Sequence, residues 1–180
     1  MARTLDTIDT HWITRLACVI ALLWFATGCT TAPSRTAAVT FVVVRHAEKA
    51  TDDPRDPSLS TAGMARAQAL ATLIPDGPVV AAYATRYRRT QLTAEPTARA
   101  AGINVTTYDA DLPAEAVARQ LRDTHAHGTV LVVGHSNTAP GIAAALCACE
   151  VPPMADDAFN IIHRIDIHPG DAPVLRSSTY

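Results

Sequence analysis

Two histidines stand at the ends of apolar segments of the chain. Arg45 and His46 follow the apolar residues 40–44, and His135 follows the apolar residues 129–134. Continuous runs of β-branched residues are typical of strands that are buried on both faces of a parallel α/β sheet. Ligands of such sheets bind beyond the carboxyl ends of the strands. We therefore expect Arg45, His46 and His135 at the mouth of one site.

This combination of arginine and histidine suits the chemistry of a phosphoryl group. A guanidinium group binds phosphoryl oxygens through two parallel hydrogen bonds and keeps its charge at any physiological pH. Positive charges near His46 disfavour its protonated form, and a neutral imidazole nitrogen can attack phosphorus. The residue types therefore indicate that His46 is a nucleophile toward phosphorus, with arginines that stabilise the transferred charge.

Three segments, in chain order, resemble the signature of the histidine phosphatase superfamily, the phosphoglycerate-mutase-like proteins. Residues 45–48 (Arg-His-Ala-Glu) are similar to the Arg-His-Gly motif, with Ala47 in place of the usual glycine. In residues 83–94 an arginine precedes a Thr-Ala pair by four residues, and this register selects Arg89 as the second arginine of the pocket. Residues 134–137 (Gly-His-Ser-Asn) are similar to the motif of the second histidine.

The resemblance implies a metal-independent phosphatase without a cofactor. It implies a phosphohistidine intermediate on His46 that water then hydrolyses, with Arg45, Arg89 and His135 in contact with the phosphoryl oxygens. Asn137 is a further candidate for substrate binding, because it stands before a predicted helix whose N-terminal N–H groups would face the anion.

The acid that protonates the leaving group is not identified by a motif. In one branch of the family an aspartate directly follows the second histidine, but Ser136 occupies that position here. Asp109 and Asp111 follow a predicted strand and remain as candidates. We prefer Asp111, because it is nearer to the start of the next helix.

Alternation of strand and helix patterns predicts one α/β domain over residues 39–180. We expect a three-layer sandwich with a mostly parallel central sheet and helices on both faces. Pro96 lies inside one predicted helix, where a kink or a break is expected. The first predicted strand ends at Arg45, and the others cover residues 79–84, 103–108, 129–134, 159–167 and 174–180. The predicted helices cover residues 61–74, 86–101, 113–127 and 139–149.

Cys147 and Cys149 lie two positions apart on the last predicted helix. Side chains at this spacing point to different faces of a helix, so a disulfide between them would be strained. We therefore expect two small buried thiols.

Residues 1–28 have the pattern of an export signal. Arg3 and Arg15 precede the apolar residues 16–26, which are fewer than the roughly 20 apolar residues that a transmembrane helix needs. The following Thr-Gly-Cys sequence resembles a bacterial lipobox, in which Cys29 becomes the lipid-modified N-terminus. Residues 29–38 would then be a tether; an uncleaved anchor or an ordinary signal peptide is the alternative.

Composition and the export signal together limit the partners. A net charge of −2 and 5% aromatic residues argue against a nucleic-acid surface. The signal predicts a lipid-anchored protein on the periplasmic side of a bacterial cell envelope, and Thr30 after the cysteine favours the outer membrane. We expect the substrate to be a phosphorylated envelope component or small metabolite. A non-catalytic phosphate-binding lipoprotein of the same fold is the alternative.

Overall fold

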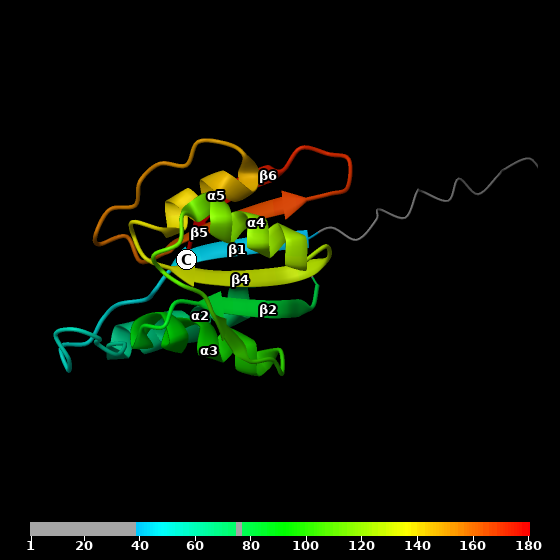
Figure 1. Ribbon diagram of the computed structural model, residues 1–180. Coiled ribbons are helices and arrows are strands. Elements are labelled where there is room, and N and C mark those ends of the chain that lie inside the picture. The colour runs from blue at the N-terminus through cyan, green and yellow to red at the C-terminus, as the bar shows by residue number, and fades with distance from the viewer. Residues whose placement is uncertain (1–38, 75–76) are drawn as a thin grey trace, which may run out of the picture. The chain divides into compact units, whose positions relative to one another are not determined.

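The computed structural model describes residues 39–74 and 77–180. The predicted export signal, the lipid-modified Cys29 and the tether lie outside the described residues. The elements are β1 (Val39–Arg45), α2 (Thr61–Leu73), β2 (Val79–Ala84), α3 (Arg88–Ala100), β3 (Val105–Thr107), α4 (Ala114–Thr124), β4 (Gly128–Gly134), α5 (Ala139–Cys147), β5 (Ile161–Ile167) and β6 (Val174–Thr179) (Figure 1). In this part of the chain, no helix is long and apolar enough to cross a membrane.

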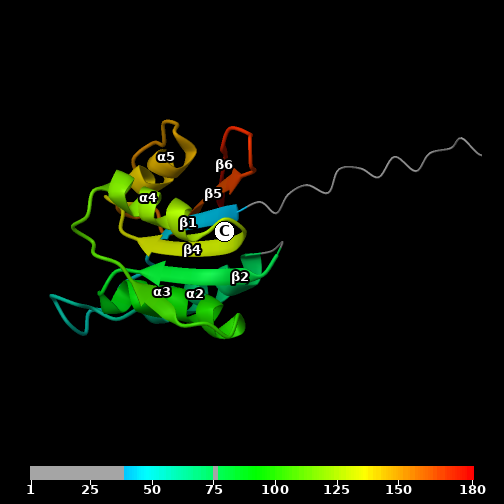
Figure 2. The same ribbon diagram turned by 45° about the vertical axis from the view of Figure 1, so that its right-hand side comes forward.

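The described strands form one six-stranded sheet in the order β3-β2-β4-β1-β5-β6. The first four strands in this order are parallel, and β5 and β6 join in antiparallel pairing. Helices α4 and α5 cover one face of the sheet, and α2 and α3 cover the other (Figures 1 and 2). The structure therefore confirms the predicted three-layer sandwich with a mostly parallel sheet.

The apolar run in β1 is buried on both faces of this sheet. Phe41 and Val43 pack in the core beneath α4 and α5, whereas Val42 and Val44 pack in the core beneath α2 and α3. All four are 4% exposed or less. Burying a side chain of this size stabilises the fold by about 1.5–3 kcal/mol, so β1 is strongly held at the centre of the sheet.

Strand register brings the carboxyl ends of three strands to one edge. Arg45 pairs with Gly134, so His46 and His135 leave the sheet at the same level. The backbone N–H of His46 also donates to the Gly134 carbonyl at 2.9 Å. Because β2 ends next to β4 at this level, Thr85 follows it at the same edge.

The break that was one of the two expectations at Pro96 does not occur. Helix α3 continues through Pro96, which removes one backbone donor but does not end the helix. In α2 the buried positions are Gly63, Ala67 and Leu70, whereas the large apolar side chain of Met64 is 52% exposed. Gly63 lies close to the backbone of Glu48.

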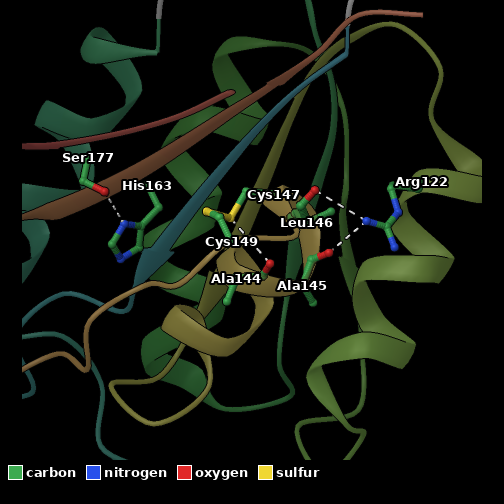
Figure 3. Close-up of a disulfide and its surroundings, with 8 residues drawn as sticks. All are labelled: Arg122, Ala144, Ala145, Leu146, Cys147, Cys149, His163 and Ser177. Carbon is green, nitrogen blue, oxygen red and sulfur yellow. Dashed lines mark hydrogen bonds between the residues drawn. A yellow bond between two sulfur atoms is a disulfide. The ribbon is translucent and has the colours of Figure 1, made fainter. Parts of the chain in front are cut away.

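The expectation of two free thiols is also wrong, since Cys147 and Cys149 form a disulfide with an S–S distance of 2.07 Å (Figure 3). Helix α5 ends at Cys147, and Ala148 adopts a left-handed conformation with φ of 53°. Cys149 therefore lies beyond the helix, where helical periodicity no longer directs its side chain. The same end of α5 is tied to α4, because Arg122 Nη1 donates to the Ala145 carbonyl at 2.8 Å (Figure 3).

Replacing Gly63 by alanine is expected to destabilise the protein. A Cβ atom at this position would lie 2.3 Å from the backbone oxygen of Glu48, in the loop that follows His46. Relief of such a clash costs about 1–3 kcal/mol. A glycine-to-alanine change inside an unobstructed helix instead stabilises by up to about 1 kcal/mol. Chemical denaturation of Gly63→Ala measures the sign, and a more stable variant would contradict the close approach of α2 to this loop.

Candidate active site

An open pocket of about 570 Å³, the main pocket, lies where β1 and β4 end. All the residues predicted for the site line it, namely Arg45, His46, Arg89, Asp111, His135 and Asn137. The pocket also contains Tyr87, Asp156 and Phe159, which sequence reasoning missed.

His46 is held with one ring nitrogen directed into a fixed hydrogen bond. Its Nδ1 lies 2.7 Å from the carbonyl oxygen of Ala47. Because a carbonyl oxygen only accepts, Nδ1 carries the proton of the neutral ring, and Nε2 keeps its lone pair. Ala47 is itself buried, and its N–H donates to Thr93 Oγ1 at 3.0 Å. Ala47, at the position where the resembled motif has glycine, therefore presents the carbonyl that sets the tautomer.

The pKa values of both site histidines lie far below the ordinary value of 6.5. Burial, together with the charges of His135, Arg89 and Arg45, lowers the pKa of His46 to about 3, although the hydrogen bond to Ala47 raises it. Burial, followed by the charges of Arg89 and Arg45, lowers the pKa of His135 to about 4. The two rings lie with centroids 5.4 Å apart. Both are therefore neutral at neutral pH, as a nucleophilic imidazole requires.

Arg45 is fixed by contacts from the segment that precedes β5. Its Nη1 donates to the carbonyls of Ala155 and Asp156 at 3.1 and 2.8 Å. Its guanidinium carbon lies 4.1 Å from the centre of the Phe159 ring. Among the side-chain atoms that the structure describes, Arg45 Nε is buried and has no hydrogen-bond partner.

Arg89 reaches the pocket from the first turn of α3. Its guanidinium carbon lies 4.3 Å from the centre of the Tyr87 ring, and its Nη1 lies 3.8 Å from Asp56 Oδ1. Within the described residues, its Nε is also a buried donor without a partner. A buried donor left unpaired costs about 1–3 kcal/mol, so an anionic oxygen in the pocket would relieve a cost at both arginines. The neighbouring Arg88 instead points to solvent, with 52% of its side chain exposed.

The ring of His135 is oriented by hydroxyl groups. Its Nε2 lies 3.0 Å from Thr85 Oγ1, which lies 2.8 Å from Thr90 Oγ1. When Thr85 donates to Nε2, the proton of the neutral ring is on Nδ1 and is available to a phosphoryl oxygen. Helix α3 begins after Tyr87, so Thr85 does not cap it, and the Thr85 hydroxyl instead orients the ring of His135.

Close packing brings the start of α5 against the end of β4. A Cβ atom at Gly134 would lie 2.9 Å from Thr138 Oγ1 and 3.1 Å from the Tyr108 hydroxyl, so this position requires glycine. Thr138 Oγ1 accepts from the backbone N–H of His135 at 3.0 Å. Thr138 occupies the N-cap position of α5 but its side chain holds the histidine backbone.

Two carboxylates reach the main pocket. Asp111 and Asp156 are among the described residues that line it, and Asp109 is not. Asp109 Oδ1 instead accepts from the Asp111 backbone N–H at 3.0 Å, which shapes the turn that presents Asp111. Asp156 had no sequence signal, because it lies in an irregular segment far along the chain from Arg45. Within the described residues, no group of three or more His, Cys, Asp or Glu side chains could hold a metal ion.

Lowering the pH is expected to reduce the free energy of unfolding, because both site histidines stay neutral in the folded protein while they become protonated in the unfolded chain. Folded pKa values of about 3 and 4 lie below the unfolded value near 6.5, so the unfolded chain binds more protons between these limits. The contribution of these two histidines to the free energy of unfolding is complete above pH 6.5 and is lost as the pH falls toward their folded pKa values of about 4 and about 3. Thermal unfolding of wild type and His46→Asn from pH 7.5 to 4.5 measures this, and the variant should show the shallower decline. Titration of the His46 ring near pH 6.5 by NMR would contradict the assignment.

Comparison with known proteins agrees with these features. Residues 41–112 match the family model of the histidine phosphatase superfamily (branch 1), and this range includes Arg45, His46 and Arg89. A search of curated proteins found no match. The structure is similar to the putative phosphohistidine phosphatase SixA from Nakamurella multipartitia, with a TM-score of 0.60 and 20% identity over 80% of this chain and 97% of that chain.

Two further solved structures show the same likeness. The putative SixA from Agrobacterium tumefaciens has a TM-score of 0.59 and 21% identity over 80% of this chain and 98% of that chain. Phosphoserine phosphatase from Entamoeba histolytica, solved with 3-phosphoglyceric acid, has a TM-score of 0.59 and 15% identity over 79% of this chain and 97% of that chain. At these identities the likeness shows a common fold. The family match covers residues 41–112, and the likeness of fold extends over about 80% of the chain.

Proposed function

We propose that this protein is a phosphoric monoester hydrolase that acts through a phosphohistidine on His46. The observation that carries the proposal is the state of His46: its ring is neutral, its Nδ1 is held by the Ala47 carbonyl, and its Nε2 is left with a lone pair. Arg45 and Arg89 in the same pocket each hold a buried, unpaired Nε donor that suits an anionic oxygen. The match of residues 41–112 to the histidine phosphatase superfamily model supports the same conclusion.

The reaction has two balanced steps. In the first, His46 Nε2 forms a bond to phosphorus while the bond from phosphorus to the ester oxygen breaks, and Asp111 gives a proton to the departing alkoxide. In the second, water attacks phosphorus, Asp111 takes a proton from the water, and the bond from Nε2 to phosphorus breaks to release phosphate. Arg45, Arg89 and His135 stabilise the charge on the equatorial oxygens in both steps.

Rapid quenching after addition of a ³²P-labelled monoester tests the proposal. We expect label on wild-type protein that is stable in alkali and lost in acid, as a phosphohistidine is, and no label on His46→Asn. Equilibrium dialysis with inorganic phosphate runs in parallel. Bound phosphate without label or turnover would overturn the proposal in favour of a non-catalytic phosphate-binding protein. The exposure of Asp111 and Asp156, the two carboxylates of the pocket, favours this alternative.

The Asp111→Asn substitution is expected to slow the hydrolysis of substrates more strongly the more basic their leaving groups are. A poor leaving group such as an alkoxide needs a proton in the transition state, and general acid catalysis contributes about 10²- to 10⁴-fold. For an alkyl phosphate we expect a fall in kcat/KM of about 10²-fold, whereas para-nitrophenyl phosphate should change by less than about fivefold. Asp156→Asn is the matched comparison, because Asp156 is the other exposed carboxylate of the pocket. If Asp156→Asn shows the graded loss and Asp111→Asn does not, the assignment of the acid is reversed.

We also propose that the protein acts on the periplasmic side of the cell envelope, anchored through a lipid on Cys29, and preferably at the outer membrane. The Cys147–Cys149 disulfide supports this location, because disulfides persist in oxidising compartments such as the bacterial periplasm. A phosphorylated envelope component or small metabolite is the corresponding substrate. Membrane fractionation and labelling with a radioactive fatty acid test the anchor, and a Cys29→Ala protein that still fractionates with membranes would refute it.

A further inference from the structure

A second, smaller pocket of about 210 Å³ opens beside the main pocket, and it is called the side pocket here. It lies between the first turn of α4 and the first turn of α5, two helices that pack against each other on the same face of the sheet. Its walls include the aliphatic side chains of Ala110, Leu112, Ala114, Val117 and Ile142, and the polar side chains of Tyr108, Asn137 and Thr138 also line it. Among the described residues, no charged side chain lines it.

The two pockets share part of their lining. Ala110, Asn137 and Thr138 border both of them. The side chains of Arg45, His46, Arg89 and His135 are not among the described residues that line the side pocket. A ligand whose phosphoryl group lies in the main pocket can therefore extend past these shared residues into an apolar space.

Glycine keeps this space open. Gly141 lines the side pocket at the first turns of α5, and a Cβ atom there would lie 3.2 Å from Ala114 Cβ. A larger residue at position 141 would therefore narrow the gap between the two helices. Leu112, at the rim, is 41% exposed although it is a large apolar side chain, so burying it against a ligand would be favourable.

We propose that the side pocket binds the leaving group of the substrate, and that this group is a compact apolar one, such as a short alkyl chain or a single aromatic ring. The inference rests on the proposed function and narrows its substrate class to phosphate monoesters of apolar alcohols. The volume fits this size, since a cavity of about 150 Å³ lined by aliphatic side chains accommodates benzene. Of the polar side chains that line the side pocket, the Tyr108 hydroxyl already donates to the Val133 carbonyl and Thr138 Oγ1 already accepts from the His135 N–H. Most hydroxyl groups of a sugar phosphate would therefore lie unpaired against the aliphatic walls, which is unfavourable.

Binding of n-alkylphosphonates tests the inference without turnover, because the carbon–phosphorus bond is not hydrolysed. Calorimetry with methyl-, propyl-, butyl- and hexylphosphonate gives affinity against chain length. We expect a gain of up to about fourfold per methylene, followed by a plateau once the side pocket is full. A hydroxyl-terminated phosphonate of the same length as butylphosphonate should lose most of that gain.

Two variants and one control locate the effect. Ala114→Leu fills the side pocket, and Leu112→Asp places a charge at its exposed rim, where folding is not at risk. In both, the ratio of butyl to methyl affinity should fall by at least about fivefold. Leu73→Asp makes the same exchange at a 47% exposed leucine at the end of α2 and should keep the wild-type ratio.

The outcomes separate the two proposals. If the affinity of the wild type is independent of chain length, the inference is overturned even if the protein hydrolyses monoesters. The inference is also overturned if both Leu112→Asp and Ala114→Leu retain the wild-type dependence of affinity on chain length. Length-dependent binding without a phosphoenzyme would overturn the proposed hydrolysis and leave the side pocket as a ligand-specificity site. If neither inorganic phosphate nor any phosphonate binds, both proposals fail.

Discussion

Replacing His46 by alanine is expected to lower kcat/KM for a phosphate monoester by about 10⁴-fold or more. The covalent route through Nε2 is then lost, and the remaining arginines can only stabilise direct attack by water. Removal of the ring also empties a buried position beside His135, but it leaves the backbone bond from residue 46 to Gly134 available. Steady-state kinetics with para-nitrophenyl phosphate, and the quench assay on the same protein, measure the loss.

His163→Ala is the matched control for this variant. His163 is as buried as His46, with both at 4% exposure, and its Nδ1 bonds Ser177 Oγ on the neighbouring strand β6 (Figure 3). Its loss should lower the melting temperature and leave kcat/KM within about threefold of wild type. Equal losses of activity in the two variants would show that His46 matters only for stability, and the nucleophile would have to be sought elsewhere.

Replacing Arg89 by alanine is expected to reduce kcat/KM by about 10²- to 10³-fold. The side chain supplies a charge and a buried, unpaired Nε to the main pocket. Loss of a donor that acts on the charge developing in the transition state lowers kcat, and loss of its contact with the bound phosphoryl group raises KM. Separate measurement of kcat and KM, together with the affinity for inorganic phosphate, shows how much of the loss comes from the chemical step and how much from substrate binding.

The adjacent arginine provides the comparison. Arg88 has the same side chain one position earlier on α3, but it is half exposed and its ion pair with Asp52 spans 3.4 Å at the surface. Arg88→Ala should change kcat/KM by no more than about twofold, because exposed ion pairs contribute little. A large loss in Arg88→Ala with none in Arg89→Ala would mean that the family register was applied one residue too late.

The position of the two histidines follows from short-range features of the sequence. Residues 40–44 and 129–134 are apolar and mostly β-branched, a pattern typical of strands that are buried on both faces of a parallel sheet. The structure places Phe41 and Val43 in one core and Val42 and Val44 in the other. Because β1 and β4 are parallel neighbours with Arg45 opposite Gly134, His46 and His135 lie at the same edge of the sheet.

The choice among the arginines needed more than periodicity. Arg86 and Arg89 would share one face of a helix that began at residue 86, so the resemblance to a family was needed to select Arg89. In the structure α3 begins only at Arg88, and Arg89 is brought to the pocket side by contact with Tyr87 and Asp56. Residues in a loop and at a helix start are placed by such contacts, which no local pattern encodes.

By itself the sequence determined the sheet, the two histidines at its edge and, through the family register, the two arginines. Only the tertiary structure decided the rest of the pocket. Phe159 and Asp156 reach Arg45 from more than a hundred positions away, and the disulfide forms because Ala148 turns left-handed where α5 ends. Periodicity indicates which face of an element is buried. The contacts between distant residues depend on how all the elements pack together, and no short segment of the sequence encodes that packing.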